Sequence, residues 1–211
     1  MTNALVRSII IAFLVALASC DARPGARLEL AVASDDAGVI RQVQAILYNR
    51  LREATGGIFG DVRTSYFPEL NKLVYEITAG APGPEALEYL YSTRGEYRVF
   101  VAEEDGEVTD WITNQDVADA DSGRASSGPT VFVGLSPLAA RRVAEVSGEY
   151  IGATIQASLD GEFLYAQTLT WPIQRFYQFE VASMEEAEML ASVLKFGALP
   201  TDVVPWNENS R

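Results

Sequence analysis

Residues 28–103 alternate segments with strand periodicity and segments with helix periodicity, in the order β-α-β-β-α-β. In the first helical segment the apolar residues recur every three or four positions, at Val39, Ile40, Val43, Ile46, Leu47 and Leu51. A second helix is expected to begin at Pro84, because proline suits the first helical turn. Two helices on one face of an antiparallel sheet can bury all these apolar faces together. The order therefore predicts an α+β fold that starts with a ferredoxin-like base over residues 28–106.

Residues 107–204 follow a different order, which predicts a second α+β subdomain with a mainly antiparallel sheet and two helices. The polar stretch 107–128 is expected to be a loop. Asp160-Gly161, between two strand-like segments, is a strong signal for a two-residue hairpin turn. Two helix starts are marked by the N-cap pair Ser136-Pro137 and by the capping box Ser183-Met184-Glu185-Glu186. Residues 205–211 are expected to form a short tail.

The last helical segment ends in Gly197-Ala198-Leu199-Pro200. Glycine terminates a helix in a left-handed conformation at no Cβ cost, and proline cannot continue the helix. The sequence therefore predicts a positive φ at Gly197.

The N-terminal segment resembles a bacterial lipoprotein signal. Arg7 precedes an apolar run that is too short to span a bilayer, and the run ends at Cys20, the only cysteine of the chain. We expect residues 1–19 to be a signal peptide, Cys20 to carry the lipid, and residues 20–27 to form a tether. The alternative is an ordinary signal peptide with an incidental cysteine. In Gram-negative lipoproteins of this kind an aspartate at the place of Asp21 is a sorting signal for the inner membrane, so we expect a periplasm-facing envelope protein.

Composition narrows the classes of function. The net charge of −13 disfavours nucleic acid and broad contact with anionic lipid. The chain has no histidine, which excludes Ser-His-Asp and Cys-His catalysis and the common zinc sites. Its glycine-rich stretch, residues 56–60, lacks the lysine of a phosphate-binding loop. We therefore expect neither an enzyme nor a bound cofactor or metal.

Several motifs in the second half resemble the first periplasmic domain of SecD, a membrane subunit of the protein-export machinery. They are the helix end Met189–Leu194 with Gly197–Pro200, the strand-turn-strand of residues 153–169, the helix start Leu135–Ala140, and the segment Gln115–Ala120. The resemblance implies a base and a head subdomain, and contact with unfolded polypeptide or the Sec translocon. In that family the chain continues into membrane helices, whereas residues 201–211 contain no such apolar stretch. The expectation is a soluble domain anchored by its lipid.

Four aromatic residues are candidates for binding a polypeptide: Trp111, Phe163, Tyr165 and Trp171. Phe163, Tyr165 and Trp171 share one face of a strand by alternation, and Trp111 lies in the polar stretch. Exposed aromatic side chains flanked by polar ones are a common contact for partner chains. The alternative for these side chains is that they belong to the core. For the whole protein, the alternative function is that the scaffold serves an unrelated envelope partner. An enzyme is the third and least favoured alternative.

Overall fold

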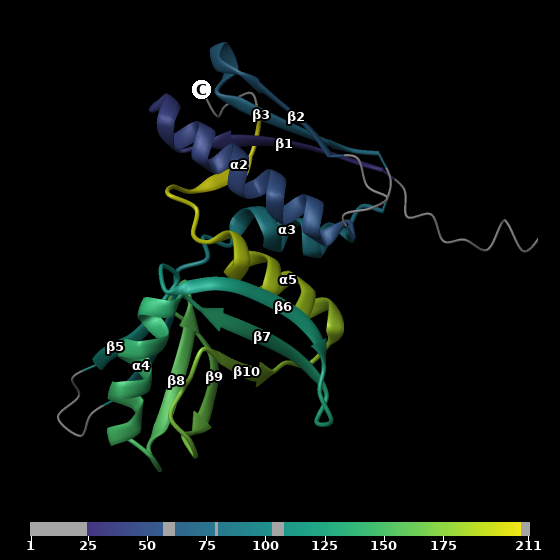
Figure 1. The fold of residues 1–211 in the computed structure, drawn as a ribbon. Coiled ribbons are helices and arrows are strands. Elements are labelled where there is room, and N and C mark those ends of the chain that lie inside the picture. The colour runs from purple at the N-terminus through teal and green to yellow at the C-terminus, as the bar shows by residue number, and fades with distance from the viewer. Residues whose placement is uncertain (1–24, 57–61, 79, 103–107, 208–211) are drawn as a thin grey trace, which may run out of the picture.

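The computed structural model describes residues 25–56, 62–78, 80–102 and 108–207, in two lobes stacked one on the other (Figure 1). The predicted lipid-attachment and sorting residues, Cys20 and Asp21, lie outside the described residues. Mixed helices and antiparallel sheets confirm the α+β class.

The base lobe is a four-stranded antiparallel sheet in the order β11-β1-β3-β2, with the helices α2 and α3 between it and the other lobe (Figure 1). A 3₁₀ turn, Pro68–Leu70, joins two of its strands. Asp36 caps α2 by accepting hydrogen bonds from the backbone N–H groups of Gly38 and Val39. The elements of this lobe are β1 (Ala26–Val32), α2 (Ala37–Ala54), β2 (Val62–Phe67), β3 (Lys72–Ile77), α3 (Pro84–Ser92) and β11 (Val203–Pro205).

The predicted element order is confirmed, but one strand pairs elsewhere than expected. Strand β4 (Tyr97–Ala102) belongs to a sheet of the other lobe, where it pairs with β5 (Val108–Thr113) and β8 (Thr154–Leu159). The fourth strand of the base sheet is β11, which pairs with β1 through Val32 and Val203. Strand periodicity reveals that a face is buried but not which sheet buries it, so the sequence did not show that β4 joins the other lobe. Strand β11 was not predicted, because residues 203–205 were assigned to the second subdomain and the tail.

The head lobe contains two antiparallel sheets, in the orders β10-β7-β6 and β5-β4-β8-β9. The prediction of a loop over residues 107–128 is wrong, because this stretch forms strands β5 and β6. Strand β6 is an edge strand whose polar side chains face solvent while Ala120 is buried, so it lacks an apolar stripe. The remaining elements are β5 (Val108–Thr113), β6 (Val117–Arg124), β7 (Pro129–Leu135), α4 (Pro137–Glu149), β8 (Thr154–Leu159), β9 (Glu162–Thr168) and β10 (Phe176–Glu180).

Helix α5 (Met184–Phe196) lies between the lobes (Figure 1). It packs against α2 and α3 on one side and against β6 and β7 on the other. The face predicted from its periodicity, Ala187, Leu190, Ala191 and Leu194, is buried. Ser183 caps the helix as predicted, because its Oγ accepts from the N–H of Glu186. The Glu186 carboxylate accepts from the N–H of Ala182 instead of that of Ser183, so the reciprocal bond of the capping box is shifted by one residue.

The chain crosses between the lobes at residues 93–96 and 197–202, and one buried arginine hydrogen-bonds to both crossing segments. Arg50 of α2 donates to the carbonyl oxygens of Leu90, Thr93, Arg94 and Gly197 at 2.6–3.1 Å. Burial lowers the pKa of Arg50 to about 10, so the guanidinium stays charged at neutral pH. From the head lobe, Asp160 accepts from the N–H groups of Gly95 and Glu96.

Gly197 has φ +79° and ψ −176°, which confirms the predicted positive φ. This combination is essentially restricted to glycine. It directs the carbonyl of Gly197 to Arg50, so the glycine both ends α5 and supplies one of the four acceptors.

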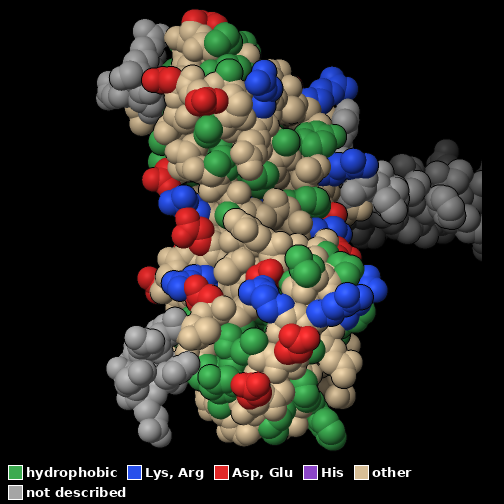
Figure 2. Space-filling model, turned by 60° about the vertical axis from the view of Figure 1, so that its left-hand side comes forward, with side chains coloured by type: hydrophobic (Ala, Val, Ile, Leu, Met, Phe, Trp, Pro, Cys, Tyr) green, Lys and Arg blue, Asp and Glu red, His purple; other side chains and the backbone are tan. Residues whose placement is uncertain are grey.

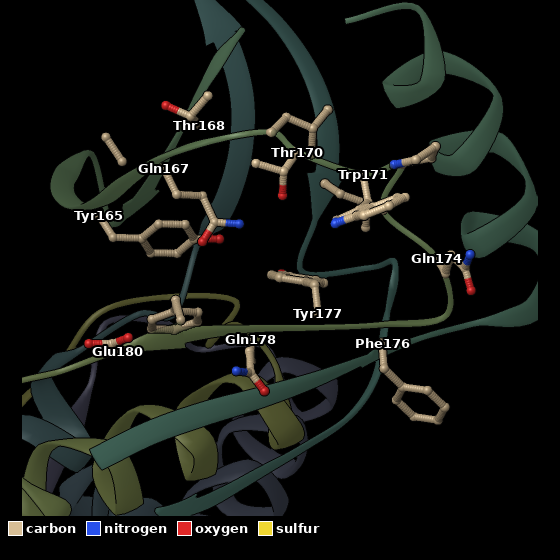
Figure 3. Close-up of a pocket in the computed structure, with 15 residues that line it drawn as sticks. Tyr165, Gln167, Thr168, Thr170, Trp171, Gln174, Phe176, Tyr177, Gln178 and Glu180 are labelled. Atoms are coloured by element: carbon tan, nitrogen blue, oxygen red, sulfur yellow. The ribbon is translucent and has the colours of Figure 1, made fainter. Parts of the chain in front are cut away.

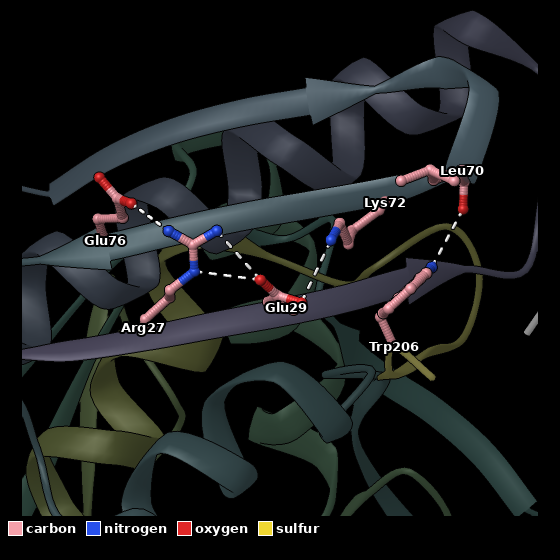
Figure 4. Close-up of polar contacts among 6 residues, drawn as sticks. All are labelled: Arg27, Glu29, Leu70, Lys72, Glu76 and Trp206. Atoms are coloured by element: carbon pink, nitrogen blue, oxygen red, sulfur yellow. Dashed lines mark hydrogen bonds and ion pairs between the residues drawn. The ribbon is translucent and has the colours of Figure 1, made fainter. Parts of the chain in front are cut away.

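The outer face of the base sheet carries a polar network that includes the end of the described chain (Figure 4). Glu29 pairs with Arg27 and Lys72, whose hydrogen bonds lower its pKa. Lys72 also lies 4.2 Å from the centre of the Trp206 ring. The indole N–H of Trp206 donates to the carbonyl oxygen of Leu70, and the backbone N–H of Trp206 donates to the backbone carbonyl oxygen of Glu29. These contacts fix the segment after β11 on the sheet.

Candidate functional site

A groove with a volume of about 880 Å³ runs between strands β9 and β10 of the head lobe (Figure 3). Each strand is the last of its own sheet, so the groove separates two strand edges that do not pair with each other. The lining consists of Tyr165, Ala166, Gln167, Thr168, Leu169, Thr170, Trp171, Pro172, Ile173, Gln174, Phe176, Tyr177, Gln178, Phe179 and Glu180. Its volume lies in the range typical of ligand sites.

Three tyrosines from different strands join the two sheets beneath the groove. The hydroxyl oxygen of Tyr97 in β4 lies 2.7 Å from that of Tyr177 in β10 and 3.2 Å from that of Tyr165 in β9. The ring of Tyr165 stacks on Phe179, with 4.4 Å between ring centroids. Burial raises the pKa of all three tyrosines well above the usual value, so they remain neutral. The hydroxyls hydrogen-bond to one another, and the three tyrosines form a floor beneath the groove.

The segment from β9 to β10 presents Trp171 on the rim. Leu169 and Ile173 on either side are buried. Leu169 exchanges backbone hydrogen bonds with Gly152 and Ala153, and the N–H of Ile173 donates to Ser147 Oγ of α4. Anchored at both points, the segment leaves Trp171 79% exposed.

Strand β10 supplies a second exposed aromatic ring, Phe176, which is 70% exposed. The remaining rim is formed largely by glutamine and threonine side chains, and Glu180 is the only charged side chain among the lining residues. Large hydrophobic side chains that face solvent are concentrated in the head lobe: Phe132, Leu138, Ile151, Phe163, Trp171 and Phe176. Figure 2 shows hydrophobic side chains gathered toward the head-lobe end of one face, with charges of both signs across the middle.

The predicted aromatic residues have different environments. Trp171 lies on the rim and Tyr165 in the floor. Phe163 is 67% exposed but lies outside the lining, because a bulge between β8 and β9 shifts the alternation between Phe163 and Tyr165. Trp111 is only 3% exposed, in β5, and packs edge-on against Tyr150, so it offers no surface to a partner.

The sequence reasoning missed the contribution of β10, whose residues Phe176–Glu180 all line the groove. Tyr177 points into the groove, whereas Phe176 and Gln178 lie on the other face of the strand (Figure 3). The alternation of Phe176–Glu180 indicates a strand, but the pattern does not show that its edge faces the edge of β9.

Among the described residues, no three His, Cys, Asp or Glu side chains come close enough together to hold a metal ion. None of the described helices is long and apolar enough to cross a membrane.

Comparisons with known proteins identify one family. Residues 89–201 match the family model of the SecDF P1 head subdomain. A solved structure described as SecDF in a super-membrane-facing form matches with a TM-score of 0.70 and 18% identity, covering 97% of this chain and 35% of that one. Another, described as a membrane component SecDF that enhances protein export, matches with a TM-score of 0.64 and 19% identity, covering 86% of this chain and 98% of that one. No curated protein matches.

Proposed function

The chain belongs to the SecDF P1 head subdomain family, and from this premise we propose that it serves protein export as a non-enzymatic module that binds extended polypeptide in the groove between β9 and β10. The observation that carries the proposal is the pair of exposed rings, Trp171 and Phe176, on the rim of a groove formed by two open strand edges.

The groove lining suits a ligand of variable sequence. Aromatic rings provide contact area to many kinds of side chain, and Gln167, Gln174 and Gln178 can hydrogen-bond to backbone groups, which every polypeptide offers. The tyrosine hydroxyls beneath are paired with one another and held neutral. The lining therefore favours binding over acid-base chemistry.

Membership of the family supports a link to the Sec translocon, and one related structure is described as enhancing protein export. We further propose that the module faces the periplasm and is held at the inner membrane by a lipid on Cys20, with Asp21 as the sorting signal. The alternative is an envelope lipoprotein that uses this scaffold for an unrelated partner.

Binding can be tested with a reduced and alkylated, permanently unfolded model protein that carries a dye. Fluorescence anisotropy would measure its affinity for the chain without residues 1–19 and with Cys20→Ala. Trp171→Ala should weaken binding about tenfold, as expected for a central aromatic contact. Leu138→Ala is the matched control, because Leu138 is 80% exposed on α4 and does not line the groove.

Equal affinities for the Trp171→Ala variant and the parent would place the binding site elsewhere. No binding at high micromolar concentrations would favour the unrelated-partner alternative.

A further inference from the structure

We propose that the groove takes its polypeptide by β-strand addition: an extended segment pairs antiparallel with the open edge of β10, with a cationic residue beside Glu180 and an apolar residue beside Phe176. This inference rests on the proposed function and adds the binding mode, the chain direction and the order of residues.

The backbone of β10 presents its free hydrogen-bonding groups toward the groove. On the β7 side, the carbonyl of Arg175 accepts from Leu135 and the N–H of Val181 donates to Pro129. In an antiparallel pair, alternate residues direct their N–H and C=O groups to opposite sides. Phe176, Gln178 and Glu180 therefore direct theirs to the open edge, and all three line the groove.

Strand β10 is a better template for an added strand than β9. Proteins protect edge strands with bulges, prolines or lysines. Strand β9 contains a bulge where it pairs with β8. Strand β10 pairs with β7 in unbroken register from Phe176 to Glu180 and contains no proline or lysine. An extended segment can follow it without a break in the hydrogen-bond ladder.

The two ends of β10 differ in charge, which sets the kind of side chain that an occupant places at each end. Glu180 is the only charged side chain in the lining. At the other end, the guanidinium of Arg175 lies 5.5 Å from the centre of the Phe176 ring. A cation is therefore attracted to one end and repelled from the other, where the exposed Phe176 ring favours an apolar side chain.

In the antiparallel arrangement, the residue opposite Glu180 precedes the residue opposite Phe176 along the added strand. Side chains directly opposite each other lie on the same face of a sheet. Glu180 and Phe176 are four positions apart in β10, so the occupant has a lysine or arginine followed, four positions later, by an apolar residue.

Blocked peptides test the order and the backbone pairing separately. The probe peptide contains Lys-Thr-Val-Thr-Phe in a neutral Thr/Ser host. The reversed peptide contains Phe-Thr-Val-Thr-Lys in the same host. The central Val would lie opposite Gln178 and donate its N–H to that residue. We expect N-methylation of the Val to weaken binding about tenfold, because it removes this bond and adds bulk at the edge. N-methylation of the second Thr, whose N–H points away from β10, should have a smaller effect.

Charge reversal provides a second measurement. Glu180→Lys should lower the affinity for the Lys-bearing probe and raise it for the same peptide with Asp in place of Lys. Glu188→Lys is the control, since it makes the same charge change at an exposed position of α5 outside the groove. It should leave the ratio of the two affinities nearly unchanged.

Equal binding of the unmodified and the Val N-methylated peptides would overturn strand addition, and tighter binding of the reversed peptide would overturn the direction. If these outcomes occur while the unfolded model protein still binds in a Trp171-dependent way, the proposed function stands and this inference fails. If the unfolded protein does not bind at all, both fail.

Discussion

The guanidinium of Arg50 donates a 2.7 Å hydrogen bond to the carbonyl oxygen of Gly197, 147 positions further along the chain. The same side chain holds the end of α3 and the passage that leads to β4. A single buried cation thus ties together the two points where the chain leaves and re-enters the base lobe.

Arg50→Met should lower the free energy of unfolding by about 3 kcal/mol or more, because four buried or part-buried carbonyl groups lose their donor. Chemical denaturation would measure the loss. Arg41→Met, on the exposed side of the same helix, should change stability by less than about 0.5 kcal/mol. Similar values for the two variants would show that Arg50 does not stabilise the junction.

Gly197→Val should destabilise the protein by about 1–3 kcal/mol, the range for a non-glycine residue held in a sparsely populated conformation. No atom lies within 4 Å of a Cβ built on Gly197, so the cost is conformational rather than steric. Gly83→Val is the matched control, because Gly83 also has open space around it but φ −59°. Equal melting temperatures for the two variants would contradict the conformational explanation.

The tyrosine floor predicts a loss of stability in alkali. Burial raises the pKa of Tyr97, Tyr165 and Tyr177 in the folded state above the unfolded value of about 10. The unfolded chain therefore releases phenolic protons first, so the stabilisation is complete below about pH 10 and declines above it. Each tyrosine contributes a slope of about 1.4 kcal/mol per pH unit.

Urea denaturation from about pH 8 to pH 11 would measure this slope. Tyr177→Phe should make it shallower by the contribution of one tyrosine. An unchanged slope in this variant would mean that Tyr177 ionises equally in both states.

Local chemistry in the sequence was a reliable guide to local structure. Asp160 and Gly161 both have positive φ in the hairpin turn, as the Asp-Gly pair predicts, and Ser136 caps α4. It was harder to predict which sheet a strand joins, because the alternation in β4 shows a buried face but not the lobe that buries it. The groove was the least predictable feature, since it arises where the edges of β9 and β10 meet without pairing. Trp171 is exposed as predicted. The prediction for Trp111 failed because it depended on a loop over residues 107–128, whereas β5 buries this side chain.

Cys20→Ala should abolish lipidation, because acylation requires the thiol and the chain has no other cysteine. Metabolic labelling with a radiolabelled fatty acid would measure this directly, with the unchanged chain as the positive control. Label that persists in the variant would exclude Cys20 as the attachment site.

The central claim is that the groove between β9 and β10 binds extended polypeptide. The most direct measurement is the backbone NMR spectrum of the isotope-labelled chain during titration with the unlabelled, permanently unfolded protein. We predict that the largest shift changes fall on residues 165–180, and that they decrease as salt rises and shortens the Debye length from about 30 to about 10 Å. Shift changes confined to α2, α3 and the base sheet, with residues 165–180 unaffected, would contradict the account.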